Sequence, residues 1–136
     1  MKAILPALFL LVCFPCAAQD ADTSLPLVSL NNIEYGLIDG KKVLPTLSIP
    51  EILVNQPRLL GNSGYNLLSF EVMVYTESNE ELTGPVKSDG KKYSEEIVDL
   101  LSKHANQKGT VYIDEIKAIG PDQVVRKLHG IEINFR

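Results

Sequence analysis

The sequence has no tryptophan, and it has only two cysteines and two histidines among its 136 residues. Both cysteines, Cys13 and Cys16, lie near the start of the chain. So few thiol and imidazole groups leave little material for a transition-metal site or for a nucleophile activated by histidine. If the segment that carries both cysteines is removed, no disulfide can form, and the fold must be stabilised by its apolar core alone.

Long apolar runs are also absent, apart from one at the N-terminus. This run, Ala3 to Phe14, follows a single lysine and precedes Cys16-Ala17-Ala18, an order typical of a secretory signal peptide. The run is interrupted by proline and is shorter than the roughly 20 apolar residues of a membrane span. We therefore expect residues 1–18 to be a signal peptide and the protein to be periplasmic or secreted. Lipidation at Cys13 or Cys16 is an alternative, although bulky residues precede both cysteines.

The sequence has fewer basic than acidic residues. Lysine and arginine number 13 against 17 aspartates and glutamates, so removal of Lys2 with the signal peptide would leave 12 against 17, a net charge of −5. An acidic chain disfavours nucleic acid and anionic lipid as partners. The basic residues occur as isolated pairs, which we expect to be solvated surface residues beside turns and strand edges: Lys41-Lys42, Lys91-Lys92 and Arg126-Lys127.

What the sequence does contain is a β pattern over one domain. We expect residues 19–24 to be a flexible lead-in and residues 25–136 to form a single domain. Apolar alternation broken by turn residues predicts most of the strands. They are expected at Leu25–Leu30, Ile33–Ile38, Lys41–Leu47, Tyr65–Thr76, Pro85–Ser88, Lys91–Tyr93, Thr110–Ala118, Val124–Leu128 and Ile131–Phe135. Any strand between Ser48 and Asn66 is expected to be short and bent, at Glu51–Val54 or at Arg58–Leu60.

Three local patterns sharpen this prediction. Asp39-Gly40 and Asp89-Gly90 each predict a two-residue hairpin turn, because an Asp-Gly pair readily adopts the positive φ angles such turns need. In Tyr65–Thr76, alternation predicts one buried face made of Leu68, Phe70, Val72 and Val74. In Thr110–Ala118 the apolar phase changes after Ile113, which predicts a β-bulge at Asp114-Glu115.

One helix is expected, over Ser94 to Ala105. Ser94 suits the N-cap position, and acidic residues follow it in the first turn. Ile97, Leu100 and Leu101 recur at helical spacing and share a face with His104. A helix this short must dock that face on the sheet to be stable. The sequence thus predicts a mainly β fold with one short α-helix.

Residues that could carry chemistry are few and scattered. His104 and His129 have no second ligand at helical or turn spacing, so we expect a structural or exposed role for each. Adjacent carboxylates such as Asp114 and Glu115 face opposite ways in a regular strand. Ser63 in Gly61-Asn62-Ser63-Gly64 lacks the spacing of a nucleophile elbow. The sequence therefore predicts no enzyme, no cofactor and no metal site.

Three segments together resemble one protein family. They are SFEVMVY at Ser69–Tyr75, SDGKKYSEEIVDLL at Ser88–Leu101, and KGTVYIDEIKAIGPD followed by RKL at Arg126–Leu128. In this order and spacing they are similar to the C-terminal periplasmic domain of the GldM/PorM proteins of the gliding-motility and type IX secretion motor of Bacteroidetes. In that family the turn usually reads Gly-Pro-Asp-Gly, and Gln123 stands here in place of the last glycine.

The resemblance implies an immunoglobulin-like antiparallel β-sandwich that makes protein contacts in the bacterial envelope. Full-length members carry a transmembrane helix and further domains that we do not expect here, so the motor activity is not carried over. Because loops commonly carry function, the candidate contact residues are those of two turns: Gly120, Pro121, Asp122 and Gln123, and Asp89 and Gly90.

Two other functions remain open from the sequence. A secreted sandwich with five tyrosines could be a carbohydrate- or surface-binding module, since aromatic rings stack on sugars. A small hydrolase would need His104 or His129 beside an aspartate. The protein partner and the oligomeric state are not indicated by the sequence.

Overall fold

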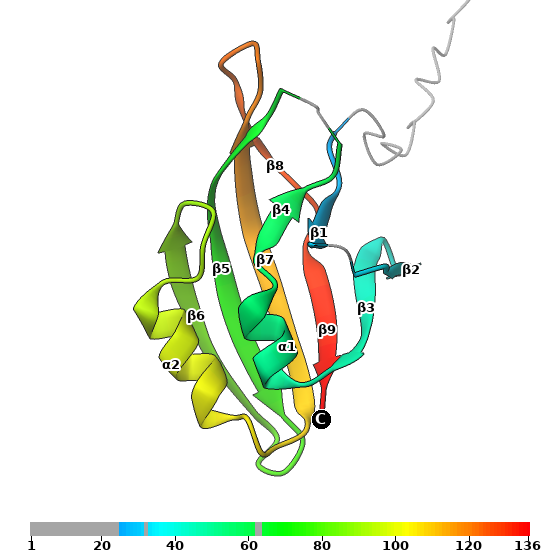
Figure 1. Ribbon diagram of the computed structural model, residues 1–136, viewed down its shortest axis with the longest axis vertical. Helices are drawn as coiled ribbons and strands as arrows, with labels where there is room; N and C mark the ends of the chain where they lie inside the picture. Colours follow the sequence, from blue (N-terminus) through cyan, green and yellow to red (C-terminus); the bar gives the residue numbers. More distant parts are fainter. Residues whose placement is uncertain (1–24, 32, 62–63) are drawn as a thin grey trace, which may run out of the picture.

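The computed structural model describes residues 25–31, 33–61 and 64–136; the expected signal peptide, the lead-in and Ser63 lie outside the described residues. The described chain is mainly β, as predicted, with its strands in two sheets. Figure 1 shows the larger sheet, whose strand order is β2-β3-β9-β7-β5-β6, with β8 also paired to β7. The elements are β1 (Val28–Leu30), β2 (Gly36–Ile38), β3 (Lys41–Leu47), α1 (Ile49–Val54), β4 (Pro57–Leu59), β5 (Asn66–Thr76), β6 (Glu81–Asp89), α2 (Glu95–Lys103), β7 (Gly109–Ile119), β8 (Val125–Lys127) and β9 (Ile131–Phe135).

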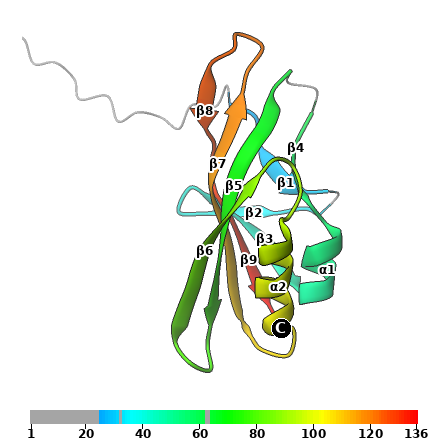
Figure 2. The same ribbon diagram turned by 90° about the vertical axis from the view of Figure 1, so that its left-hand side faces the viewer.

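The second layer of the fold covers one face of the seven-stranded sheet. It consists of the two-stranded sheet β1-β4 together with α1 and α2, which lie on the same side of the large sheet in Figure 2. The apolar core fills the space between the layers and includes Ile49 and Ile52 of α1 and Ile97 and Leu101 of α2, all 0% exposed. The opposite face of the large sheet carries no helix among the described residues.

The helix α2 confirms the sequence prediction, whereas α1 corrects it. Ser94 caps α2 and its hydroxyl accepts a hydrogen bond from the Ile97 amide at 3.3 Å. Glu51–Val54 was expected to be a strand, and it is instead part of α1. The signal for this helix was present in the sequence. Ser48 and Glu51 form a reciprocal capping box, in which the Glu51 carboxylate accepts from the Ser48 amide at 2.7 Å.

The long strands β5 and β7 pair antiparallel and contain two bulges that offset each other. The predicted bulge at Asp114-Glu115 is confirmed: the register shifts there, and Glu115 has a φ of +49°. A second shift places an extra residue in β5 between Leu67 and Ser69. Because one bulge lies on each strand, the register is restored beyond them, and the apolar residues stay on the core face.

The bulge in β5 also corrects the predicted buried face. Phe70, Val72 and Val74 are 0% exposed, as expected. Leu68 was placed with them, but it is 39% exposed, and Leu67 takes the core position at 5%. Strict alternation fails here because the extra residue in β5 shifts the core-facing positions of the strand by one residue.

One of the two predicted Asp-Gly hairpins forms. Ile38 pairs with Lys41 across Asp39-Gly40, and both turn residues have positive φ angles, +49° and +76°. Asp89-Gly90 is not a hairpin tip, because Asp89 ends β6 and the chain then runs through Lys91 and Lys92 into α2. Residues 81–89 pair with β5 instead, in a hairpin whose turn is formed by residues 77–80.

The C-terminal strand β9 lies inside the large sheet. It pairs antiparallel with β7 and parallel with β3, so the sheet is mixed and not purely antiparallel as predicted. Gly109 starts β7 where its backbone passes close to β5. A Cβ at this position would lie 1.8 Å from the carbonyl oxygen of Tyr75, so only glycine fits.

Lys42 is a charged side chain within the core layer. It lies on the same face of β3 as Leu44 and is 1% exposed, contrary to the expected surface position. Among the described residues its Nζ has no hydrogen-bond partner, and it lies 5.5 Å from the centre of the Tyr35 ring. Burial lowers the pKa of Lys42 to about 8, because apolar surroundings disfavour the ammonium form.

Lys42→Met should stabilise the protein by about 1–3 kcal/mol at neutral pH, since methionine fills similar space without a buried ammonium. The pKa of Lys42 is about 8 in the folded state and 10.5 ordinarily, so the unfolded chain holds the extra proton between these values. Wild-type stability should therefore rise with pH across that interval, and the advantage of the variant should shrink.

Urea denaturation near pH 7 and near pH 10 measures this effect. Lys41→Met, on the neighbouring exposed residue, is the control: it keeps Lys42, so its stability should rise with pH as that of the wild type does. A Lys42→Met variant less stable than the wild type at pH 7 would contradict the prediction.

Candidate functional site

The predicted turn Gly120-Pro121-Asp122-Gln123 is present and joins β7 to β8. The Gln123 amide donates to the Gly120 carbonyl at 3.0 Å, which closes the turn. Gln123 has a φ of +64°, a conformation that favours glycine. Gly120 packs tightly, because a Cβ there would lie 3.0 Å from the ring of Tyr65 and 2.8 Å from the Asp122 carboxylate.

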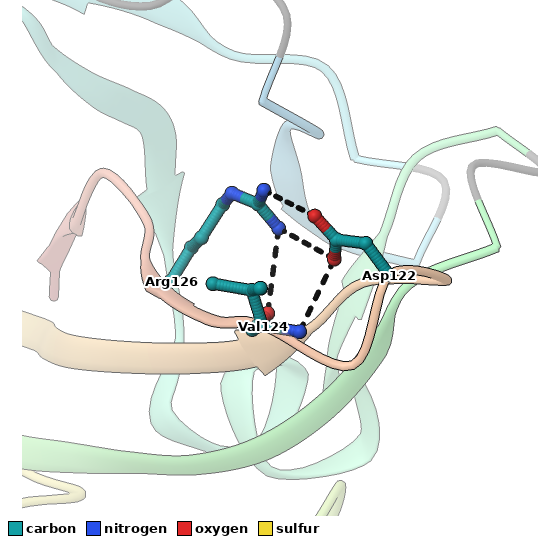
Figure 3. Close-up of polar contacts among 3 residues, drawn as sticks. All are labelled: Asp122, Val124 and Arg126. Atoms are coloured by element: carbon teal, nitrogen blue, oxygen red, sulfur yellow. Dashed lines mark hydrogen bonds and ion pairs between the residues drawn. The ribbon is translucent and has the colours of Figure 1, made fainter.

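Asp122 is engaged in bracing this turn. Figure 3 shows its carboxylate facing the Arg126 guanidinium, with N–O distances of 2.5 and 2.9 Å, while the Val124 amide donates to the same carboxylate at 3.1 Å. The hydrogen bond from Arg126, with that from Val124, lowers the pKa of Asp122 to about 2. The Arg126 guanidinium in turn lies 5.8 Å from the centre of the Tyr65 ring. The Asp122 carboxylate and the Arg126 guanidinium thus stabilise the conformation of the turn.

The second predicted site, Asp89-Gly90, is an exposed strand end. The Asp89 side chain is 86% exposed and lies 3.4 Å from the Lys87 ammonium, a surface ion pair that contributes little stability. The Ser88 hydroxyl donates to the Lys92 carbonyl, which holds the connection to α2 against β6. This hydrogen bond positions the backbone of the segment that contains Lys91 and Lys92.

A basic hollow lies between the two predicted turns. It has a volume of about 390 Å³ and lies between β4 and the start of β5. Three cations line it, Arg58, Lys91 and Lys92. Tyr65 connects the hollow to the Gly120–Gln123 turn, whereas Lys91 and Lys92 directly follow Asp89-Gly90. The remaining lining residues are Asn31, Gln56, Pro57, Leu59, Gly61 and Leu67.

The polar groups around the hollow are held by hydrogen bonds. Arg58 donates to the Asn31 carboxamide oxygen at 3.4 Å, and Asn31 donates to Asn55 at 3.1 Å. The Gln56 carboxamide accepts from the Tyr93 amide at 2.7 Å and donates to the Leu53 carbonyl at 2.9 Å. The wall that carries Arg58 is therefore connected by hydrogen bonds to the loop after β1 and to the end of α1.

Sequence reasoning did not find this hollow. Lys91-Lys92 was interpreted as a solvated pair, and Arg58 stood alone in the least regular part of the sequence. They line one hollow only because β4 packs against β5, a long-range contact that spacing along the chain does not indicate. None of the predicted turn residues is among the residues that line it.

A second surface lies on the uncovered face of the large sheet. Met73, Tyr75, Leu82 and Tyr112 line a shallow depression of about 300 Å³, together with Lys41 and Asp114. Leu82 pairs with Tyr75, and Tyr112 pairs with Met73, so the four apolar side chains lie together on three adjacent strands. The Lys41 ammonium lies 5.6 Å from the centre of the Tyr112 ring and 3.7 Å from the Asp114 carboxylate.

The other candidate residues are separate from one another. His104 is the C-cap of α2, and its Nδ1 lies 2.6 Å from the Gln107 carboxamide oxygen. His129 is exposed between β8 and β9. Asp114 and Glu115 are each near a lysine, Lys127 in the case of Glu115 at 2.6 Å. Among residues 25–31, 33–61 and 64–136, no cluster of three or more histidine, cysteine or acidic side chains could hold a metal ion.

Within the same described ranges, no helix has the length and apolar character needed to cross a membrane. No protein-family model matches the sequence, and no curated protein matches it either.

Gln123→Gly should stabilise the protein by about 1 kcal/mol, because glycine adopts the positive φ of this turn position without strain. Thermal and urea denaturation measure the change. Gln123→Ala is the matched control: it removes the same side chain but keeps the Cβ, so it should give no gain. Equal stabilisation by both variants would show that the backbone angle is not the cause.

Proposed function

We propose that this chain is a non-enzymatic protein-binding module of the bacterial envelope. The observation that carries the proposal is the uncovered face of the seven-stranded sheet, where Met73, Tyr75, Tyr112 and the 55% exposed Leu82 lie together. Aromatic residues and methionine are enriched in the centres of protein interfaces, and polar groups usually surround them. Lys41 and Asp114 provide such a polar border.

The sequence supports a more specific version of this proposal. The resemblance to the C-terminal periplasmic domain of the GldM/PorM proteins suggests a partner from the gliding or type IX secretion apparatus. Residues 120–123 form a turn at the place where that family has Gly-Pro-Asp-Gly. The N-terminal apolar run supports export, which would bring the chain to the compartment of such a partner.

Site-specific photo-crosslinking in a gliding Bacteroidetes cell tests this function. A photoreactive residue at Leu82 should capture a component of the gliding or secretion apparatus, identified by mass spectrometry, because Leu82 lies in the apolar depression. The same residue at Val98, which is 38% exposed on α2, is the control and should not capture it. Combined Tyr75→Ala and Tyr112→Ala substitutions should lower the capture about tenfold if these rings are central contacts.

Circular dichroism of the purified double variant verifies that it folds. The proposal would be contradicted if the photoreactive residue captured the component at Val98 but not at Leu82. It would also be contradicted if capture at Leu82 were undiminished in the folded double variant.

A carbohydrate-binding function is a second candidate because Tyr75 and Tyr112 line one depression. Sugar rings stack on exposed aromatic faces, although the Lys41 ammonium already lies beside the Tyr112 ring. A glycan array should then show binding that is lost in the Tyr75→Ala, Tyr112→Ala variant. An array without signal, or a signal unaffected by these substitutions, would rule this function out.

A further inference from the structure

We propose that the basic hollow between β4 and β5 binds an acidic peptide segment of a partner protein. This is a second binding surface, distinct from the depression at Tyr75 and Tyr112. Leu67, which lines the hollow, faces the core side of β5, whereas Tyr75 faces the other side. The inference therefore goes beyond the proposed function and does not require it.

The charge distribution supports this assignment. Lys41, Lys87, Arg126 and Lys127 each lie within 4.0 Å of a carboxylate. The three cations of the hollow have no such carboxylate among the residues that the structure describes, although the chain as a whole carries a net charge of −4. No acidic residue of the described chain lines the hollow, whereas Asp89, Glu95 and Glu96 line a neighbouring depression together with Lys91 and Lys92. The charged side chains that line the hollow itself are therefore all positive, and they attract anions.

The shape and ordering of the hollow suit side-chain carboxylates. A volume of about 390 Å³ lies within the usual range of ligand sites and is open to solvent, so a segment of chain can lie across it. Arg58 is oriented by Asn31, and its planar guanidinium can form two parallel hydrogen bonds to one carboxylate. Leu59, Tyr65 and Leu67 supply apolar surface for the methylene groups of glutamate or aspartate.

A peptide fits better than other anionic partners. Nucleic acid and anionic membranes present dense negative charge over long distances, and the acidic remainder of this protein repels them. A short acidic segment places its carboxylates in the hollow while the rest of its backbone stays in solvent. Its binding should be weakened by salt, because the cations lie at the surface.

Fluorescence anisotropy with the whole protein tests this inference. The probe is a short fluorescein-labelled peptide rich in aspartate and glutamate, and the matched probe has asparagine and glutamine in their place. The acidic peptide should bind and the neutral one should not. The variant Arg58→Gln, Lys91→Gln, Lys92→Gln should bind the acidic peptide at least about tenfold more weakly, which is the combined effect expected for three rim charges.

The matched control removes the same charge elsewhere. Lys103→Gln, Lys108→Gln, Lys117→Gln neutralises three exposed lysines outside the hollow and should change the affinity less than about twofold. Equal losses in both variants would show that only net charge matters, and would overturn the site. Absence of binding by the wild type would overturn it as well.

Two further measurements complete the test. The first distinguishes an acidic peptide from other anionic partners, and the second distinguishes the hollow from the depression at Tyr75 and Tyr112. Vesicles containing phosphatidylserine and a single-stranded oligonucleotide should not compete with the acidic peptide; competition at equal charge concentration would favour those partners and overturn the peptide assignment. Crosslinking from Leu82 should be unchanged in the Arg58, Lys91, Lys92 variant. If the peptide does not bind while Leu82 still captures its partner, the hollow is wrong and the proposed function stands.

Discussion

The pairing of β5 with β7 is the constraint on which the rest of the structure depends. Both strands run for eleven residues and face the core along their whole length. A single bulge in either strand would turn every following side chain to the wrong face, since the side-chain period in a strand is two. The bulges at Leu67–Ser69 and at Asp114-Glu115 offset each other, so Phe70 and Ile116 both reach the core. The helices and the small sheet then have one continuous apolar surface to cover.

Local signals in the sequence predicted much of this fold, and non-local pairing was beyond them. The bulge in β7 was indicated by the change of apolar phase after Ile113. The bulge in β5 gave no such signal, because Leu67 and Leu68 are both apolar and either could face the core. The capping box at Ser48 and Glu51 is a local signal for α1 that the prediction from sequence did not use, and Pro50 is compatible with it because proline is tolerated in the first turn of a helix. The parallel pairing of β3 with β9 left no signal, because neither strand contains a mark of its neighbour.

The candidate sites divide in the same way. The turn at Gly120–Gln123 was predicted and is present, yet its carboxylate and guanidinium act on each other and stabilise the turn. The basic residues that line the hollow were not predicted, because Arg58 is brought together with Lys91 and Lys92 only where β4 packs against β5. Tyr75 alternates with Val72 and Val74, which were predicted to be buried, and it lies on the opposite face of the strand; its proximity to Tyr112 follows only once β5 and β7 are paired.

The position of β9 determines when the sheet can close. Until residues 131–135 are available, the edges of β3 and β7 have no strand between them, and exposed strand edges readily pair with other chains. The part of the described chain made last is therefore the part that joins its two halves. The pairing of Lys42 with Ile131 connects positions that are far apart in the sequence, and such non-local contacts slow folding. Loss of this short segment would separate the sheet into two open pieces instead of merely trimming one end.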